Sequence, residues 1–87
     1  MPYISKEKRE AMDEIVDAMN WYEAEPDGRL NYVLFKYCKN RYYDKGLDSY
    51  NGYKNFIGEL NECVAEIRRR LLAPYENKKI IDNGDVL

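Results

Sequence analysis

Histidine is absent from this 87-residue sequence, and with it goes the commonest side chain of acid–base catalysis. No Cys–His pair can form, and two cysteines, Cys38 and Cys63, are too few for a zinc site, which usually takes four Cys or His ligands. The five glycines are scattered and match no phosphate-binding fingerprint. We therefore expect no catalytic residue, no bound metal, no cofactor and no enzymatic activity.

Long apolar segments are also missing. No run approaches the ~20 residues of a membrane span, and the charged first ten residues are unlike a signal peptide. These features predict a cytoplasmic protein with reduced thiols, although a disulfide between Cys38 and Cys63 stays open. Charged residues of both signs make up 34% of the chain and the net charge is −2, which argues against general nucleic-acid binding.

Apolar residues recur every three or four positions, which predicts an all-α fold with a single domain over residues 1–87. We expect a small bundle of three main helices, at about 5–22, 29–44 and 50–72. Ser5 is a plausible N-cap of the first helix, and Asp48 or Ser49 of the third. The inner stripe of the second helix is expected to comprise Leu30, Val33, Leu34, Tyr37, Cys38 and Arg41.

The third helix gives the strongest helical pattern in the chain. Its apolar positions, spaced by three and four, are Tyr53, Phe56, Ile57, Leu60, Cys63 or Val64, Ile67 and Leu71. Gly58 lies inside this helix, either because a neighbouring helix approaches closely there or incidentally. The outer glutamates at 59, 62 and 66 are more typical of a solvated face than of a metal or acid–base site.

The C-terminal tail, residues 75–87, is expected to form a short arm after Pro74 breaks or restarts the helix. Asn83-Gly84 between apolar pairs is a hairpin signal, although the flanks are only two residues long. A frayed tail, an arm docked on its own domain and an arm exchanged with another chain all remain open, and we favour docking. Since so short a chain buries little surface, we also expect a homo-oligomer, held by the third helix and the tail.

Two groups of residues are candidates for binding. If the tail folds back, a basic group would surround an anion, with a tyrosine to stack on a base. That group comprises Arg68, Arg69, Tyr75, Lys78 and Lys79. Its alternative role is to compensate the helix dipole and keep the surface soluble. An aromatic group around the second interhelical loop would bind a partner protein. It comprises Arg41, Tyr42, Tyr43, Tyr50 and Tyr53.

Both ends of the sequence resemble a family of small proteins of unknown function from bacteriophages and prophages, mostly of Gram-positive bacteria. The similar elements are Met1-Pro2-Tyr3-Ile4-Ser5-Lys6-Glu7-Lys8-Arg9, Leu30-Asn31-Tyr32, Ile57-Gly58-Glu59-Leu60, and Leu72-Ala73-Pro74-Tyr75-Glu76-Asn77-Lys78-Lys79 through Asn83-Gly84-Asp85-Val86. The resemblance implies a phage origin and a setting in the host cytoplasm, and it implies no activity.

Small phage proteins without catalytic groups often act by binding. We therefore expect a non-enzymatic accessory protein that acts on a host defence component, either a defence protein or a nucleotide signal that it sequesters. The alternative is a structural or protein-interaction module with no small ligand. This expectation rests on analogy of size and helical content.

Overall fold

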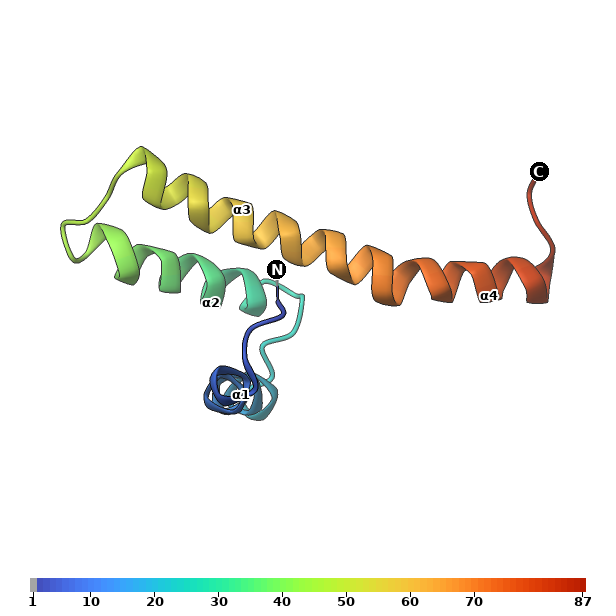
Figure 1. Ribbon diagram of the computed structural model, residues 1–87, viewed down its shortest axis with the longest axis horizontal. Coiled ribbons are helices and arrows are strands. Elements are labelled where there is room, and N and C mark those ends of the chain that lie inside the picture. Colours follow the sequence, from blue (N-terminus) through green and yellow to red (C-terminus); the bar gives the residue numbers. More distant parts are fainter. Residues whose placement is uncertain (1) are drawn as a thin grey trace. The chain divides into compact units, whose positions relative to one another are not determined.

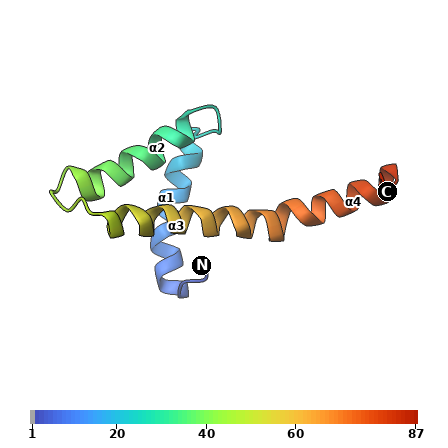
Figure 2. The same cartoon turned by 90° about the horizontal axis from the view of Figure 1, so that it is seen from above.

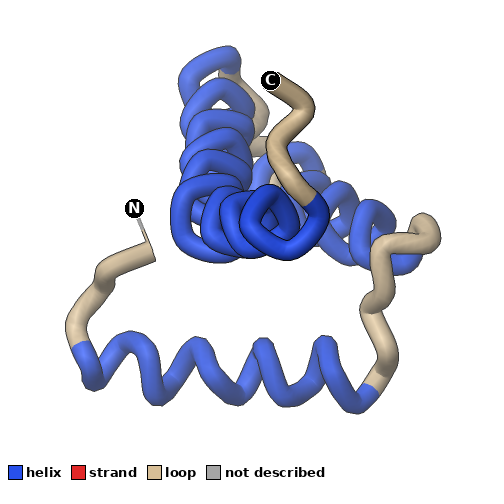
Figure 3. Tube along the Cα trace, turned by 90° about the vertical axis from the view of Figure 1, so that its right-hand side faces the viewer, coloured by secondary structure: helices blue, strands red, loops and turns tan. Residues whose placement is uncertain are grey.

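The structure is a computed structural model that describes residues 2–87. Within these residues it contains helices, turns and loops and no strand, so the predicted all-α fold with a long C-terminal helix is confirmed (Figure 3). The elements are α1 (Lys6–Trp21), α2 (Arg29–Cys38), the π turn η1 (Lys39–Tyr43), α3 (Tyr50–Ile67), the π turn η2 (Arg68–Leu72) and α4 (Ala73–Asn83) (Figure 1). The three predicted helices start within a residue or two of the observed ones.

The described chain divides into two units, residues 2–56 and 57–87, and the boundary falls inside α3. The first unit holds α1, α2, η1 and the beginning of α3. The second holds the rest of α3 with η2 and α4. The single domain over residues 1–87 stays a prediction.

Helix α1 is defined by its two ends. The Ser5 hydroxyl accepts a hydrogen bond from the backbone N–H of Lys8 at 3.5 Å, which agrees with its predicted role as N-cap. At the other end the N–H of Ala24 reaches the carbonyl of Met19, and that of Glu23 reaches Asn20. These two bonds form a Schellman motif, in which Glu23 takes the left-handed φ of +53° usually given to glycine.

Helix α2 starts at the Pro26-Asp27-Gly28 turn. Gly28 is the N-cap, with φ +108°, while an Asp27 carboxylate oxygen accepts the backbone N–H of Arg29 at 3.2 Å. The Arg29 guanidinium also donates to both Asp27 oxygens. These hydrogen bonds favour the charged carboxylate and lower the pKa of Asp27 below its usual range.

A helical hairpin links α2 to the first turns of α3. Helix α2 widens into η1, where the N–H of Asp44 donates to the carbonyl of Lys39 five residues back, and Gly46 with φ +67° reverses the chain. Of the two predicted caps, Asp48 and Ser49, it is Ser49 that caps α3, by accepting the N–H of Gly52 at 3.0 Å. Figure 1 shows α2 and the start of α3 running antiparallel on either side of this loop.

Aromatic rings join the two arms of the hairpin. The ring of Tyr42 lies edge-on to those of Tyr53 and Phe56, at centroid distances of 5.9 and 6.3 Å, and Tyr37 lies 6.0 Å from Phe56. Such pairs contribute about 0.5–1.5 kcal/mol each beyond their area. The prediction of Arg41 on the inner stripe was wrong: Arg41 is exposed and Tyr42 is half-buried. The π turn adds backbone to the last turn, so the inner position falls one residue later.

Residues 57–83 are helical throughout, since α3, η2 and α4 follow one another without a gap (Figure 2). We call the continuous helix formed by α3, η2 and α4 the long helix. The predicted arm of residues 75–87 was therefore wrong over most of its length. Pro74 is the second residue of α4, directly after a π turn in which Ala73 N–H reaches back five residues to Arg68. Early helical positions tolerate proline, and the wider turn removes the need for its missing N–H.

The Asn83-Gly84 signal marks the end of a helix and not a hairpin. Gly84 has φ +87° and donates its N–H to the carbonyl of Ile80, at 2.8 Å, so the glycine stops α4. Only Asp85, Val86 and Leu87 follow this stop. A glycine that ends a helix and one that closes a two-residue hairpin both need a positive φ, which is why the dipeptide misled.

No side chain in residues 2–87 is fully buried. The most covered positions are half-buried, and those of the hairpin are Leu30, Leu34, Cys38, Lys39, Tyr42, Gly52, Tyr53 and Phe56. The predicted apolar faces of α1 and of the long helix remain largely in contact with solvent. Among the described helices, none is long and apolar enough to cross a membrane.

The two glycines of α3 provide a matched test of the hairpin. A Cβ at Gly52 would lie 3.1 Å from the Tyr42 ring and 3.0 Å from the Ser49 hydroxyl, whereas a Cβ at Gly58 would meet nothing within 4 Å. We expect Gly58→Ala to raise the free energy of unfolding by up to about 1 kcal/mol. Gly52→Ala should lower it or leave it unchanged, because the Tyr42 ring must move. Urea unfolding measures both, and an equal gain at the two positions would contradict the packing of Tyr42.

Candidate functional site

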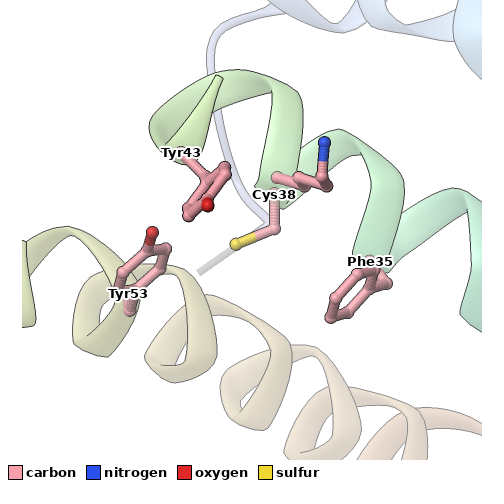
Figure 4. A pocket seen from close by; sticks show the side chains of 5 residues that line it. Phe35, Cys38, Tyr43 and Tyr53 are labelled. Atoms are coloured by element: carbon pink, nitrogen blue, oxygen red, sulfur yellow. The ribbon is translucent and has the colours of Figure 1, made fainter. Parts of the chain in front are cut away.

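A pocket opens on the hairpin, within residues 2–56. Its volume is about 440 Å³, and it is lined by Phe35, Cys38, Lys39, Tyr43 and Tyr53. Helix α2 supplies Phe35 and Cys38, η1 supplies Lys39 and Tyr43, and α3 supplies Tyr53. In Figure 4 the rings of Tyr43 and Tyr53 lie on one side of the Cys38 thiol, and Phe35 lies at the far end. We call this cavity the hairpin pocket.

Regular spacing places the α2 side of the pocket. Phe35, Lys39 and Tyr43 follow one another at intervals of four, so they share one face of the helix that runs from α2 into η1. The neighbouring face carries Leu34, Cys38 and Tyr42, which are half-buried in the hairpin. The pocket therefore lies beside the packed face of the hairpin, toward its outer side.

An ion pair borders the pocket. The ammonium of Lys39 lies 2.7 Å from an Asp44 carboxylate oxygen and 5.6 Å from the centroid of the Tyr43 ring. The hydrogen bond to Asp44 favours the charged amine and raises the pKa of Lys39. Both partners are partly exposed, so the pair orients the Lys39 side chain more than it stabilises the fold.

Tyr53 combines packing with the pocket wall. Its ring contacts Tyr42 on one side, and loss of water around it raises the pKa of its hydroxyl, with the nearby Asp48 charge adding to the effect. The pocket thus offers apolar walls, phenol hydroxyls and one oriented cation. This combination suits an apolar or aromatic group with a polar edge.

The predicted aromatic group is brought together only in part. Tyr43 and Tyr53 line the hairpin pocket, whereas Tyr42 packs inside the hairpin. Tyr50 is 79% exposed, with the Lys54 ammonium 6.0 Å from its ring centroid, and does not line the pocket. Arg41 is exposed and is also outside the lining.

Sequence reasoning missed three lining residues, Phe35, Cys38 and Lys39. Cys38 was placed on the inner stripe of the second helix as a packing position. Phe35 and Lys39 were left off that stripe, which gives no binding signal by itself. The spacing of four that joins them to Tyr43 was the available clue, because it places an aromatic, a cation and an aromatic on one helix face.

The predicted basic group is spread along the second unit. Arg68 and Arg69 lie in η2, and Tyr75, Lys78 and Lys79 in α4, so the fold-back that would have surrounded an anion does not occur. Arg69 is bound to Glu66, at 2.9 Å. Within this group the structure brings Lys79 to Tyr75, with the ammonium 5.5 Å from the ring centroid.

The sequence raised two further candidates, a metal site on the glutamates of the third helix and a disulfide between Cys38 and Cys63. In the part of the chain that the structure describes, no cluster of three or more Cys, Asp or Glu side chains is placed to hold a metal ion, the glutamates of α3 included. Cys38 and Cys63 are both free thiols, the first half-buried and the second exposed.

The chain belongs to a family described as a domain of unknown function, DUF6899, whose profile matches residues 1–86. This agrees with the expectation of an uncharacterised family. Neither the curated proteins nor the solved structures contain a match.

The raised pKa of Tyr53 predicts how the hairpin responds to alkali. Because the folded state holds this hydroxyl neutral above the ordinary value of 10.0, its contribution to stability is complete below pH 10. The contribution is lost as the pH rises through the higher pKa of the folded state. We expect the free energy of unfolding to fall above pH 10 in the wild type, and to fall less in Tyr53→Phe.

Urea unfolding between pH 8 and 11 measures this difference. Tyr50→Phe is the control, because Tyr50 is exposed and the substitution removes no packed hydroxyl. Identical alkaline slopes for the wild type and Tyr53→Phe would show that Tyr53 is not desolvated.

Proposed function

We propose that this chain is a non-enzymatic, phage-encoded accessory protein that binds a protein component of the host's defences in the cytoplasm of the infected cell. The hairpin pocket carries the proposal, because it is open, mostly apolar and lined by three aromatic rings. The phage setting and the host target come from the resemblance of the two chain ends to small phage proteins.

The chemistry of the pocket favours a protein target. Aromatic residues clustered around a cavity are typical of the few positions that dominate protein–protein affinity. A cavity of about 440 Å³ accepts one or two large apolar side chains from a partner, and the Lys39–Asp44 pair at its edge offers both a donor and an acceptor to the partner's backbone. Phe35 and Tyr43 are 70% and 63% exposed, so their rings are accessible to such a partner.

A nucleotide signal is the second candidate, and one observation favours it. Tyr75 is exposed on α4 with the Lys79 ammonium beside its ring, a pairing that stacks on a base and contacts a phosphate. Arg68 precedes Tyr75 by seven residues on the same helix. One cation–ring pair carries this candidate, whereas five residues line the hairpin pocket, so we place the protein target first.

Removing one pocket wall tests the protein target. Tyr43→Ala deletes an exposed ring but leaves the Tyr42, Tyr53 and Phe56 contacts intact. Against purified components of host defence systems, we expect one component to bind the wild type and to bind Tyr43→Ala at least about 30-fold more weakly, the loss typical of a 2 kcal/mol anchor.

Tyr50→Ala is the matched control, because Tyr50 is an exposed tyrosine of the same hairpin outside the pocket. It should bind like the wild type. Equal losses in both variants would point to the loop surface in place of the pocket, and no loss in either would contradict the proposal.

A nucleotide panel tests the second candidate. A cyclic or linear oligonucleotide that binds the folded chain should stabilise it by about 2.7 kcal/mol at a hundredfold excess over the dissociation constant, seen as a rise in melting temperature. Tyr75→Ala should abolish the rise, while Tyr50→Ala should keep it. A panel without any rise removes nucleotides from consideration.

A further inference from the structure

The long helix exposes an apolar stripe that no element of its own unit covers. The stripe runs along one face at intervals of three and four, and its members are Ile57, Leu60, Val64, Ile67 and Leu71. Val64 and Ile67 are 48% and 49% exposed. About half of each of these two side chains is exposed, as expected where an apolar side chain is covered only by its own helix.

An exposed stripe of this kind is covered best by a second apolar stripe of similar length and spacing. A second copy of the chain supplies a surface of matching size and chemistry.

The spacing of the stripe indicates how a second copy would lie. Intervals of three and four that alternate are the pattern by which two helices pack side by side. If the copies run antiparallel, Leu60 of each faces Leu71 of the other, and Val64 faces Ile67. These pairs give four consecutive apolar layers centred between Ala65 and Glu66.

Charge selects the antiparallel orientation. Residues 57–67 carry three glutamates and no basic side chain, whereas residues 68–79 carry five basic side chains and one glutamate. A parallel pair would place Arg68, Arg69 and Arg70 beside the same three residues of the other copy, six like charges at one level. An antiparallel pair places these arginines at the level of residues 61–63 of the other copy, between its Glu59 and Glu66.

We propose that two copies of this chain associate through the stripe of the long helix, in antiparallel orientation and centred near Ala65. The proposal does not depend on the hairpin pocket or on its target. The protein alone is therefore sufficient for the test, and a failure here leaves the proposed function standing.

Two lysine substitutions test the surface. Val64→Lys places a charge in the centre of the stripe, and we expect it to raise the dimer dissociation constant at least tenfold in sedimentation equilibrium. Ile81→Lys is the matched control, because Ile81 is 82% exposed and lies outside the stripe, seventeen residues beyond Val64. It should remain dimeric. A wild type that is monomeric at tens of micromolar, or a Val64→Lys variant that associates like the wild type, overturns the proposal.

Spin labels test the orientation without disturbing the stripe. In a Cys38→Ala background, a label on the natural Cys63 lies near the centre, so the two labels of a dimer should be within about 20 Å in pulsed dipolar spectroscopy. In a Cys38→Ala, Cys63→Ala, Ile81→Cys variant, a label on the introduced thiol lies near the ends, and two such labels should be about 45 Å apart. Short distances at both positions would show a parallel pair, and no dipolar coupling at Cys63 would show no pair. Either result overturns the proposal.

Discussion

Every part of this structure depends on how little apolar surface the chain covers by itself. Folding has to offset roughly 1–2 kcal/mol of backbone entropy per residue, mainly by removing apolar surface from water. Here no described side chain is fully buried, and the best covered positions are the aromatic contacts of the hairpin. Much of the amphipathic faces of α1 and of the long helix is left exposed, and for the long helix we propose that a second copy covers it.

Local interactions define the elements in place of a core. Serine caps at Ser5 and Ser49 begin two helices, and glycines with positive φ at Gly46 and Gly84 end the others. The two π turns then change which positions of each helix lie on a given face. The first brings Tyr42 into the hairpin and Tyr43 onto the pocket wall, and the second lets the long helix continue past Pro74. The candidate site therefore results from the first π turn, η1.

The sequence was most informative where helical period and capping chemistry agreed. The three helices and the serine caps at Ser5 and Ser49 were predictable for that reason. The structure of the tail was not predictable, because the effect of a proline or an Asn-Gly pair on the backbone depends on the turn that precedes it. Pro74 follows a π turn that leaves its missing N–H without consequence, and a π turn has no composition of its own. The same limitation explains the error at Arg41.

The candidate site was predictable in part. The tyrosines of the second loop were recognised from their density, and two of them do line the hairpin pocket. Phe35, Cys38 and Lys39 were not predicted as site residues, because their place in the site depends on what lies across the hairpin. The basic group failed for a different reason: its convergence required a fold-back, and a helix that continues to Asn83 spreads the same charges along its length.

The locality of the caps and turns has a kinetic consequence. Helices and hairpins held by contacts between near neighbours in sequence form within microseconds, since little loop entropy opposes them. Pairing of two chains is bimolecular and much slower at low concentration. Newly made chains would therefore acquire their secondary structure at once and their covered surface only as they accumulate. If two copies pair as proposed, the concentration of the protein in the cell would set the moment at which the stripe becomes covered.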